Sequence, residues 1–181
     1  ELLLYLADMF EHELEQADEA MATRLEAYRE APREGDLAAL ERLAAAVEGV
    51  GSNYETSLLA PLVDRGKRLA GVSGFQAERE GSFRVIADHI RCLTFAIADG
   101  ILPANDGRGY VLRRILRRAI RAGHQHLGAR EPFIYKLVPA VVTTLGDTFP
   151  SLVQQASRVV HAIREEEIAF GKTLDRGIAL F

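Results

Sequence analysis

Apolar residues recur at helical spacing along nearly the whole chain, and no segment shows the strict alternation of a half-buried strand. Residues 2–30, for example, are rich in Leu, Ala and Glu and contain neither Gly nor Pro. Gly and Pro fall instead between the apolar runs, where they interrupt helices. The pattern predicts an all-α protein, a helical bundle, with helices over residues 2–30, 37–49, 54–69 (interrupted near Pro61), 82–98, 110–122, 131–145 and 150–181.

The length and the cysteine content limit the class of protein. A chain of 181 residues suits one domain, or one domain with a small appendage. Its single cysteine, Cys92, cannot form an internal disulfide and suggests a reducing compartment. No run approaches 18 apolar residues, and the first residues lack the basic flank of a signal peptide. We therefore expect a cytoplasmic protein without a membrane segment.

The net charge of −4 hides a strong asymmetry along the chain. Residues 107–130 contain seven arginines and no acid, whereas residues 1–30 contain nine acids and two arginines. A chain that is acidic on average is not typical of a nucleic-acid-binding protein. Its basic segment, taken alone, is typical of one.

The basic segment from Val111 to Arg121 alternates two apolar residues with two arginines. At about 100° per residue, a helix collects the apolar residues on one face and the guanidinium groups on the other. Like charges stacked in this way oppose helix formation, so an external polyanion would stabilise the helix. Gly107 and Gly109 leave backbone N–H groups free at the helix start, where the dipole also favours phosphate. The residues predicted to bind RNA phosphates are Arg108, Arg113, Arg114, Arg117, Arg118 and Arg121.

Two alternatives remain open at this point. The arginines could pair with acids of the same chain or of an acidic partner, since the chain supplies 26 acidic residues. Asn105, in the loop before the arginines, offers a donor and an acceptor suited to a base edge. It could equally be a turn-forming residue.

The sequence offers little catalytic chemistry. His124 and His126 have no third ligand at a spacing typical of a metal site. His89 shares an apolar face with Ile86 and Ile90, which favours a core histidine, and residues 165–167 look like a solvated acidic face. We expect no catalytic residue and no metal site.

Three runs, Phe83–Arg91, Ile97–Asn105 and Gly107–Ala119, closely resemble alanyl-tRNA synthetases, in the helical middle domain that binds the tRNA acceptor stem. Weaker similarity extends the match to about residues 37–181. The resemblance implies a partner, the acceptor stem of alanine tRNA, whose G·U wobble pair the family identifies. It implies that Asn105 takes part in reading that pair and that the arginine helix supports the RNA backbone. The family's second recognition residue, an Asp, has no counterpart among residues 1–181.

The same resemblance has departures that concern catalysis. Residues 35–42 align with the third motif of this class II family, whose glycines are replaced here by Leu37 and Ala39. Arg42 remains as a remnant of the ATP site. The segments that build the family's catalytic sheet have no match. We therefore expect that this chain alone does not form an adenylate and has no cofactor of its own, ATP and Mg²⁺ belonging to the parent family's catalytic part.

These observations divide the chain into an acidic N-terminal helix over residues 1–34, without a family match, and a tRNA-binding helical domain over residues 35–181. The leading hypothesis is a detached tRNA-binding module that is inactive alone. A second hypothesis is part of a split ligase that contributes Arg42 and Asn105 to a catalytic domain in trans. A third is a helical protein-interaction module whose arginine face pairs with acidic helices, residues 1–30 included.

Overall fold

The computed structural model describes residues 37–71 and 77–179, and every regular element in those ranges is helical. The prediction of an all-α fold is confirmed. The chain separates into two compact units, residues 1–60 and 61–181. The predicted helix over residues 2–30 and the predicted boundary at residues 34–35 lie outside the described residues. The elements are α3 (Leu37–Glu48), η1 (Asn53–Glu55), α4 (Ala60–Leu69), α5 (Ala77–Ala98), α6 (Gly107–His126), η2 (Ile134–Leu137), α7 (Val138–Leu145) and α8 (Pro150–Ala179).

The described part of the first unit consists of α3 and η1, joined by polar side chains. The Asn53 amide donates to the Glu41 carboxylate at 3.0 Å. Glu48 accepts from both the backbone N–H and the hydroxyl of Ser57, at 2.7 and 2.8 Å. Because these carboxylates lie on α3, they fix the segment that follows it against the helix.

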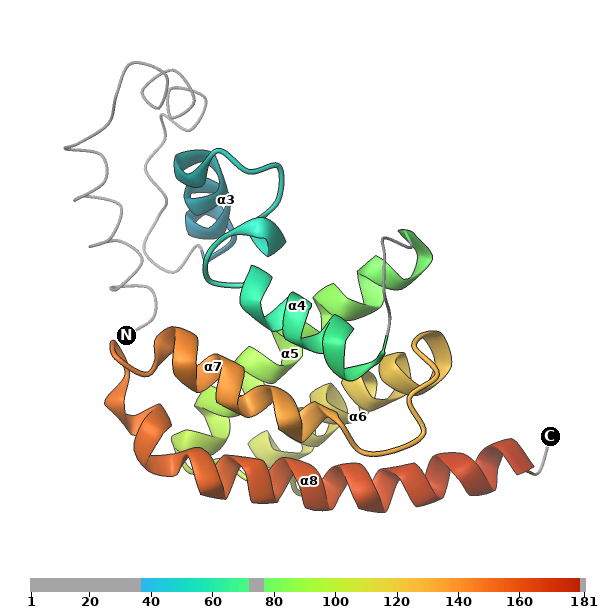
Figure 1. The fold of residues 1–181 in the computed structure, drawn as a ribbon. Coiled ribbons are helices and arrows are strands. Elements are labelled where there is room, and N and C mark those ends of the chain that lie inside the picture. Colours follow the sequence, from blue (N-terminus) through green and yellow to red (C-terminus); the bar gives the residue numbers. More distant parts are fainter. Residues whose placement is uncertain (1–36, 72–76, 180–181) are drawn as a thin grey trace. The chain divides into compact units, whose positions relative to one another are not determined.

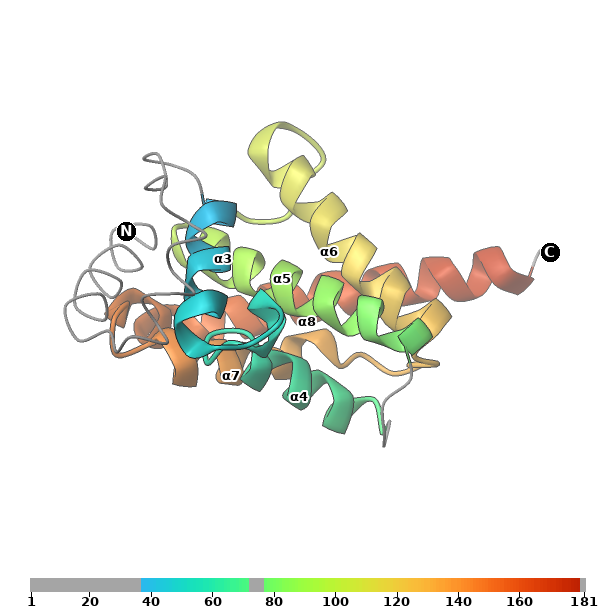
Figure 2. The ribbon, with the colours of Figure 1, turned by 90° about the horizontal axis from the view of Figure 1, so that it is seen from above.

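The second unit is built around α5. Figures 1 and 2 show α6 on one side of α5 and α7 on the other, with the long helix α8 running along all three. Each of these helices buries one apolar stripe against its neighbours, and the stripes together form one core. The core residues that are almost completely buried include Ile86, Ile90, Leu93, Ile97, Leu116, Leu137, Val141, Leu152, Val159 and Ile163.

Several helix ends follow ordinary sequence signals. α5 ends before Gly100, whose φ of 96° allows the N–H of Ile101 to bond the carbonyl of Ala96 at 2.9 Å. α8 begins at Pro150, as predicted, because proline suits the first turn of a helix.

Other ends differ from the predictions. The helix expected to start at residue 82 is longer, because α5 starts at Ala77 and Ser82 is buried inside it. α6 continues past Gly123 to His126. A Cβ on Gly123 would lie 2.6 Å from the Phe133 ring, so this glycine serves close packing and does not end the helix. The helix expected over residues 131–145 divides into η2 and α7.

Candidate nucleic-acid interface

The N-terminus of α6 is held tightly against the loop that precedes it. The backbone N–H of Ala104 donates to the carbonyl of Gly109 at 3.0 Å. A Cβ on Gly109 would lie 2.5 Å from the carbonyl oxygen of Leu102 and 2.6 Å from the Cβ of Ala104. Only glycine permits this approach. Gly107 adopts a φ of +53° at the first position of α6, which glycine also favours. The loop and the helix start therefore form one local unit.

Asn105 lies in this loop with its side chain exposed. Its Oδ1 accepts a hydrogen bond from the Arg113 guanidinium, two turns into α6. The same guanidinium donates to the carbonyl of Pro103 at 3.5 Å. The residue expected to read a base edge is thus in direct contact with a residue expected to bind phosphate.

The arginine face of α6 is partly neutralised by a carboxylate from α8. Glu166, whose side chain is 10% exposed, lies 2.7 Å from Nη2 of Arg117 and 3.2 Å from Nε of Arg113. Nε of Arg117 also donates to Glu166 at 2.8 Å. The expectation that residues 165–167 form a solvated face is therefore wrong for Glu166, which is buried because it bridges two arginines of the neighbouring helix.

The other four predicted arginines, Arg108, Arg114, Arg118 and Arg121, have exposed side chains. In the described ranges, 37–71 and 77–179, none of the four forms an ion pair with a carboxylate. Arg114 lies over the ring of Tyr110, with its guanidinium carbon 5.8 Å from the ring centre. Of the six arginines, Arg113 and Arg117 are thus paired with Glu166, and the other four face solvent.

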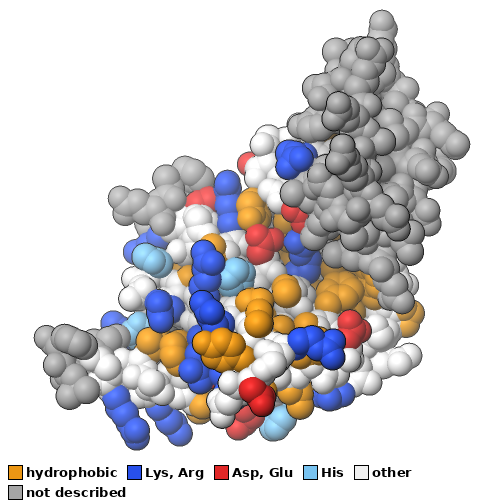
Figure 3. Space-filling model, turned by 180° about the vertical axis from the view of Figure 1, so that it is seen from behind, with side chains coloured by type: hydrophobic (Ala, Val, Ile, Leu, Met, Phe, Trp, Pro, Cys, Tyr) orange, Lys and Arg blue, Asp and Glu red, His pale blue; other side chains and the backbone are white. Residues whose placement is uncertain are grey.

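A shallow groove of about 630 Å³ runs beside these arginines. Val111 is 57% exposed although it lies on the apolar arc of α6, because that arc is wider than the contact of α6 with α5 and α8. Figure 3 shows Lys and Arg side chains gathered on this side of the molecule, with His and hydrophobic side chains beside them. The groove is lined by His89, Val111, Arg114, Ile115, Arg117, Arg118, Arg121 and Phe170.

His89 and Phe170 give the groove chemistry beyond charge. His89 is only half-buried, so the expectation of a core histidine is wrong. Burial, and next the positive charge of Arg118, lower the pKa of His89 below its ordinary value, against a smaller opposing effect of Asp88. The guanidinium of Arg117 lies over the Phe170 ring at 4.9 Å. The groove therefore offers guanidinium groups and apolar surface together, which suits a ligand with phosphates and rings.

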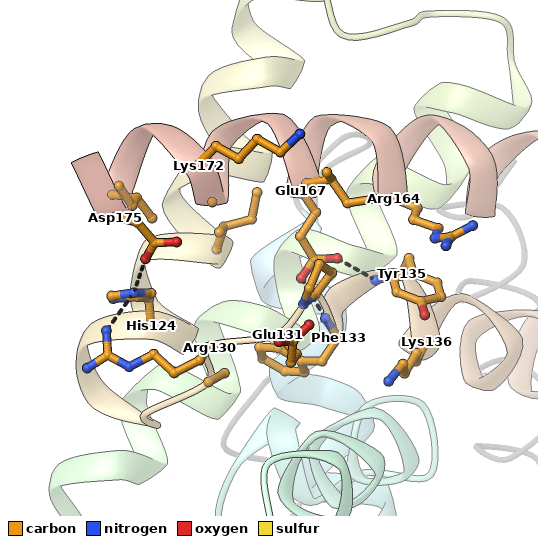
Figure 4. Close-up of a pocket in the computed structure, with 16 residues that line it drawn as sticks. His124, Arg130, Glu131, Phe133, Tyr135, Lys136, Arg164, Glu167, Lys172 and Asp175 are labelled. Atoms are coloured by element: carbon orange, nitrogen blue, oxygen red, sulfur yellow. Dashed lines mark hydrogen bonds and ion pairs between the residues drawn. The ribbon is translucent and has the colours of Figure 1, made fainter. Parts of the chain in front are cut away.

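A second hollow, of about 530 Å³, is lined by residues of α6, η2 and α8 and is drawn in Figure 4. Glu167 accepts hydrogen bonds there from the backbone N–H groups of Phe133, Ile134 and Tyr135, at 2.7, 2.9 and 3.3 Å. Burial raises the pKa of Glu167, although these hydrogen bonds and Lys136 oppose the shift. Glu167, which is 3% exposed, also contradicts the expected solvated face, because it caps η2.

Arg42, Leu37 and Ala39 belong to the first unit, whereas His124 lies near the end of α6. Arg42 is exposed on α3, in the other unit, and the side chains of Leu37 and Ala39 lie outside the described residues. His124 contacts Arg130 at 2.9 Å and Asp175 at 3.6 Å. Among the described residues, no three His, Cys, Asp or Glu side chains gather as metal ligands. No helix in the described part of the chain is long and apolar enough to cross a membrane.

Sequence reasoning missed Glu166 and Glu167 as participants. A signal for them exists in the spacing of α8, where Val159, Ile163 and Phe170 mark the buried face at helical intervals. Residues 166 and 167 fall on that face between Ile163 and Phe170. Acids at core-facing positions predict buried partners, which the count of charges alone does not reveal.

Comparisons with known proteins agree on one family. The sequence model of the family described as tRNA synthetases class II (A) matches residues 16–181. That match starts upstream of residue 37 and includes part of the stretch 1–34, for which no counterpart was expected. The alanine–tRNA ligase of Bordetella petrii is 48% identical over 141 residues, which are 78% of this chain and 16% of that protein.

Further relatives give similar figures. The alanine–tRNA ligase of Christiangramia forsetii is 49% identical over 77% of this chain and 16% of its own length. That of a Thermotoga species, strain RQ2, is 47% identical over 80% of this chain and 17% of its own length. The chain thus spans about a sixth of the length of the curated relatives it matches.

Proposed function

The chain belongs to the class II tRNA synthetase family of the alanyl type, and from this premise we propose that α6 and its preceding loop bind the acceptor stem of a tRNA. The observation that carries the proposal is the set of four exposed arginines on α6, Arg108, Arg114, Arg118 and Arg121, for which the described residues supply no carboxylate. Guanidinium groups bind phosphate in bidentate fashion without regard to base, so these side chains would hold the RNA backbone.

Base reading is assigned in this proposal to Asn105. The resemblance to the family supports that role, because Asn105 stands in the run that matches the family's acceptor-stem loop. Its exposure supports the role as well, since a base edge must reach the amide. We propose that Asn105 favours a stem with a G·U pair over one with G·C at the same place.

Catalysis is a separate matter. We propose that this chain serves the tRNA-recognition step of alanine–tRNA ligation in the cytoplasm, and that a catalytic domain supplies adenylate formation with ATP and Mg²⁺. Leu37 and Ala39, at positions where the family motif has glycine, support the view that the chain alone does not activate alanine. Alanine-dependent pyrophosphate exchange by the isolated chain, above a heat-killed control, would contradict this part of the proposal.

The proposal is tested by titrating the full chain with an alanine-tRNA acceptor hairpin at several salt concentrations. If about four arginines meet phosphates, the logarithm of the association constant falls with a slope of roughly −3 against the logarithm of salt. Alanine tRNA should also compete better than total RNA. Arg118→Ala should weaken binding to all stems, whereas Arg65→Ala, an exposed arginine of α4, is the matched control and should change little.

One observation favours a second candidate function, a protein-interaction module. Glu166 already forms ion pairs with Arg113 and Arg117, so this face accepts a carboxylate. In this alternative, an acidic segment such as residues 1–30 of the chain binds the four exposed arginines. A titration with no RNA binding, but with binding of a synthetic peptide of residues 1–30 to a chain lacking them, would favour this alternative.

A further inference from the structure

Three residues from three elements form one continuous series of polar contacts. Glu166 on α8 contacts Nε of Arg113 on α6 at 3.2 Å. The far end of the same guanidinium donates to Oδ1 of Asn105 in the loop and to the carbonyl of Pro103, the latter at 3.5 Å. The guanidinium of Arg113 therefore connects a buried carboxylate with the exposed amide of Asn105.

This chain of contacts decides which way the Asn105 amide faces. An exposed asparagine rotates broadly about its last torsion, so its oxygen and its NH₂ group exchange places readily. A guanidinium group carries only donors. Next to Arg113, the amide must direct its oxygen to the guanidinium and its NH₂ group away from it.

The backbone of the loop is already fixed, so the side-chain torsion is the main freedom that remains. The hydrogen bond from Ala104 to Gly109 and the close approach of Leu102 to Gly109 hold the loop on the start of α6. Arg113 itself is held by Glu166, which is buried and also bound by Arg117 at 2.7 Å. Glu166 thus holds Arg113 in place, and Arg113 in turn holds the Asn105 amide.

We propose that Arg113 and Glu166 are positioning residues that orient the Asn105 amide for base reading, and that Arg113 is not a phosphate contact. The inference rests on the proposed function, because it assigns the specificity of that same site. It divides the arginine face by task. Arg108, Arg114, Arg118 and Arg121 hold the RNA backbone, whereas Arg113 serves the residue that discriminates.

The proposal predicts opposite changes in affinity and in selectivity. Glu166 is a negative charge beside the phosphate-binding face, so its removal raises attraction for any RNA. The same removal frees Arg113 and leaves Asn105 without a fixed orientation. Glu166→Gln should therefore bind both stems as tightly as wild type or more tightly, but should prefer G·U over G·C less.

The experiment uses the full chain and two RNA hairpins that differ only in one G·U or G·C pair. Wild type, Asn105→Ala, Glu166→Gln and Arg113→Lys are compared by competition binding, with Glu165→Gln as the control. Glu165 is the exposed neighbour of Glu166, and its substitution changes the net charge equally. We expect the selectivity ratio to fall about threefold or more in Glu166→Gln and Arg113→Lys, and to stay unchanged in Glu165→Gln.

A second measurement needs no RNA. The heteronuclear NOE of the Asn105 side-chain NH₂ group, measured by NMR on the free protein, should be high in wild type and in Glu165→Gln. It should fall in Glu166→Gln and Arg113→Lys, because the amide then rotates freely. If Glu166→Gln does not fold, Arg113→Lys, which keeps the charge but lacks the fork of donors, answers the same question.

The outcomes separate the two proposals. In one outcome, wild type prefers the G·U stem, Asn105→Ala loses this preference, and Glu166→Gln and Arg113→Lys keep it. That outcome overturns the positioning role of Arg113 and Glu166, while the proposed function stands. If wild type binds neither stem, the proposed function fails. If the NOE is also unchanged in Glu166→Gln and Arg113→Lys, the positioning role of Arg113 and Glu166 is overturned as well. A lowered NOE together with a lowered selectivity ratio supports it.

Discussion

Glu166 and Glu167 are neighbours on α8, yet they serve two different regions of the molecule. Glu166 turns towards α6 and meets two guanidinium groups, Arg113 and Arg117. Glu167 turns towards η2 and accepts hydrogen bonds from three backbone N–H groups, and within residues 37–71 and 77–179 it forms no ion pair with a cation. The first carboxylate completes a charged, half-exposed surface, and the second fixes a buried connection.

The difference shows that the cost of burying a carboxylate can be compensated either by charged partners or by neutral hydrogen-bond donors, with different consequences. Charged partners compensate Glu166, and those partners remain accessible to water and to phosphate. Neutral dipoles compensate Glu167, whose pKa is raised by burial even against three hydrogen bonds. We therefore expect Glu167 to matter for stability and Glu166 for recognition.

The largest expected effect concerns Glu167. Glu167→Ala leaves the buried N–H groups of Phe133 and Ile134 without an acceptor, which should lower the free energy of unfolding by about 3 kcal/mol. Urea unfolding followed by circular dichroism measures the loss. Glu165→Ala, on the exposed side of the same turn, should change it little. An equal loss in both variants would remove the distinction between a structural and a solvated acid.

The next effect compares Arg118 with Arg117. Arg118→Ala should lower RNA affinity roughly three- to tenfold and reduce the salt slope by about 1, because an exposed phosphate contact is lost. Arg117→Ala should lower RNA affinity less, because Glu166 already occupies that guanidinium, but it should lower the melting temperature. Anisotropy titrations and thermal melts give both numbers. Equal losses of RNA affinity would mean that the ion pair with Glu166 does not make Arg117 less available to phosphate than Arg118.

A smaller effect is the pH dependence of stability through Glu167. Its pKa is raised in the folded state, so the folded protein holds a proton more readily than the unfolded chain does. Between the pKa that Glu167 has in the unfolded chain and the one it has in the folded protein, its contribution to the free energy of unfolding therefore falls as pH rises. The stability difference between wild type and Glu167→Gln should grow in favour of wild type as pH is lowered from neutral towards the unfolded pKa. Urea titrations of both proteins at several pH values test the sign.

The smallest effect lies in the groove. The lowered pKa of His89 favours its neutral form in the free protein, and bound phosphates would raise that pKa. RNA binding should then take up a proton, and affinity should rise about two- to threefold as pH falls below neutrality. His89→Gln should flatten this dependence without changing affinity at high pH. The same slope in both proteins would assign the proton to another group.

Much of the fold was predictable because it depends on local periodicity. The helical fold, the start of α8 at Pro150 and the segregation of the arginines from Leu112 and Leu116 all follow from spacing and from proline. The predicted helix over residues 110–122 ends before Gly123, because glycine commonly ends helices. The actual reason for this glycine, the ring of Phe133, comes from a residue that approaches only in three dimensions.

The sequence predicted the arginines of the candidate site, but it did not predict which of them are paired with a carboxylate and which are exposed. Arg113 and Arg114 are adjacent and chemically identical in the sequence, so no local rule separates the paired one from the exposed one. The separation is made by Glu166, 49 residues beyond Arg117. Such long-range pairings depend on how α8 packs across α6, and the charge pattern of one segment does not contain that information.

The distance between Arg117 and its carboxylate along the chain also bears on the order in which the parts are made. A ribosome finishes α6 well before it has synthesised residue 166. During that interval the helix carries its row of like charges without the counter-charge that later divides them. The face for which we propose RNA binding thus gains its counter-charge only when α8 docks, and until then every arginine of α6 is equally available to a nearby polyanion.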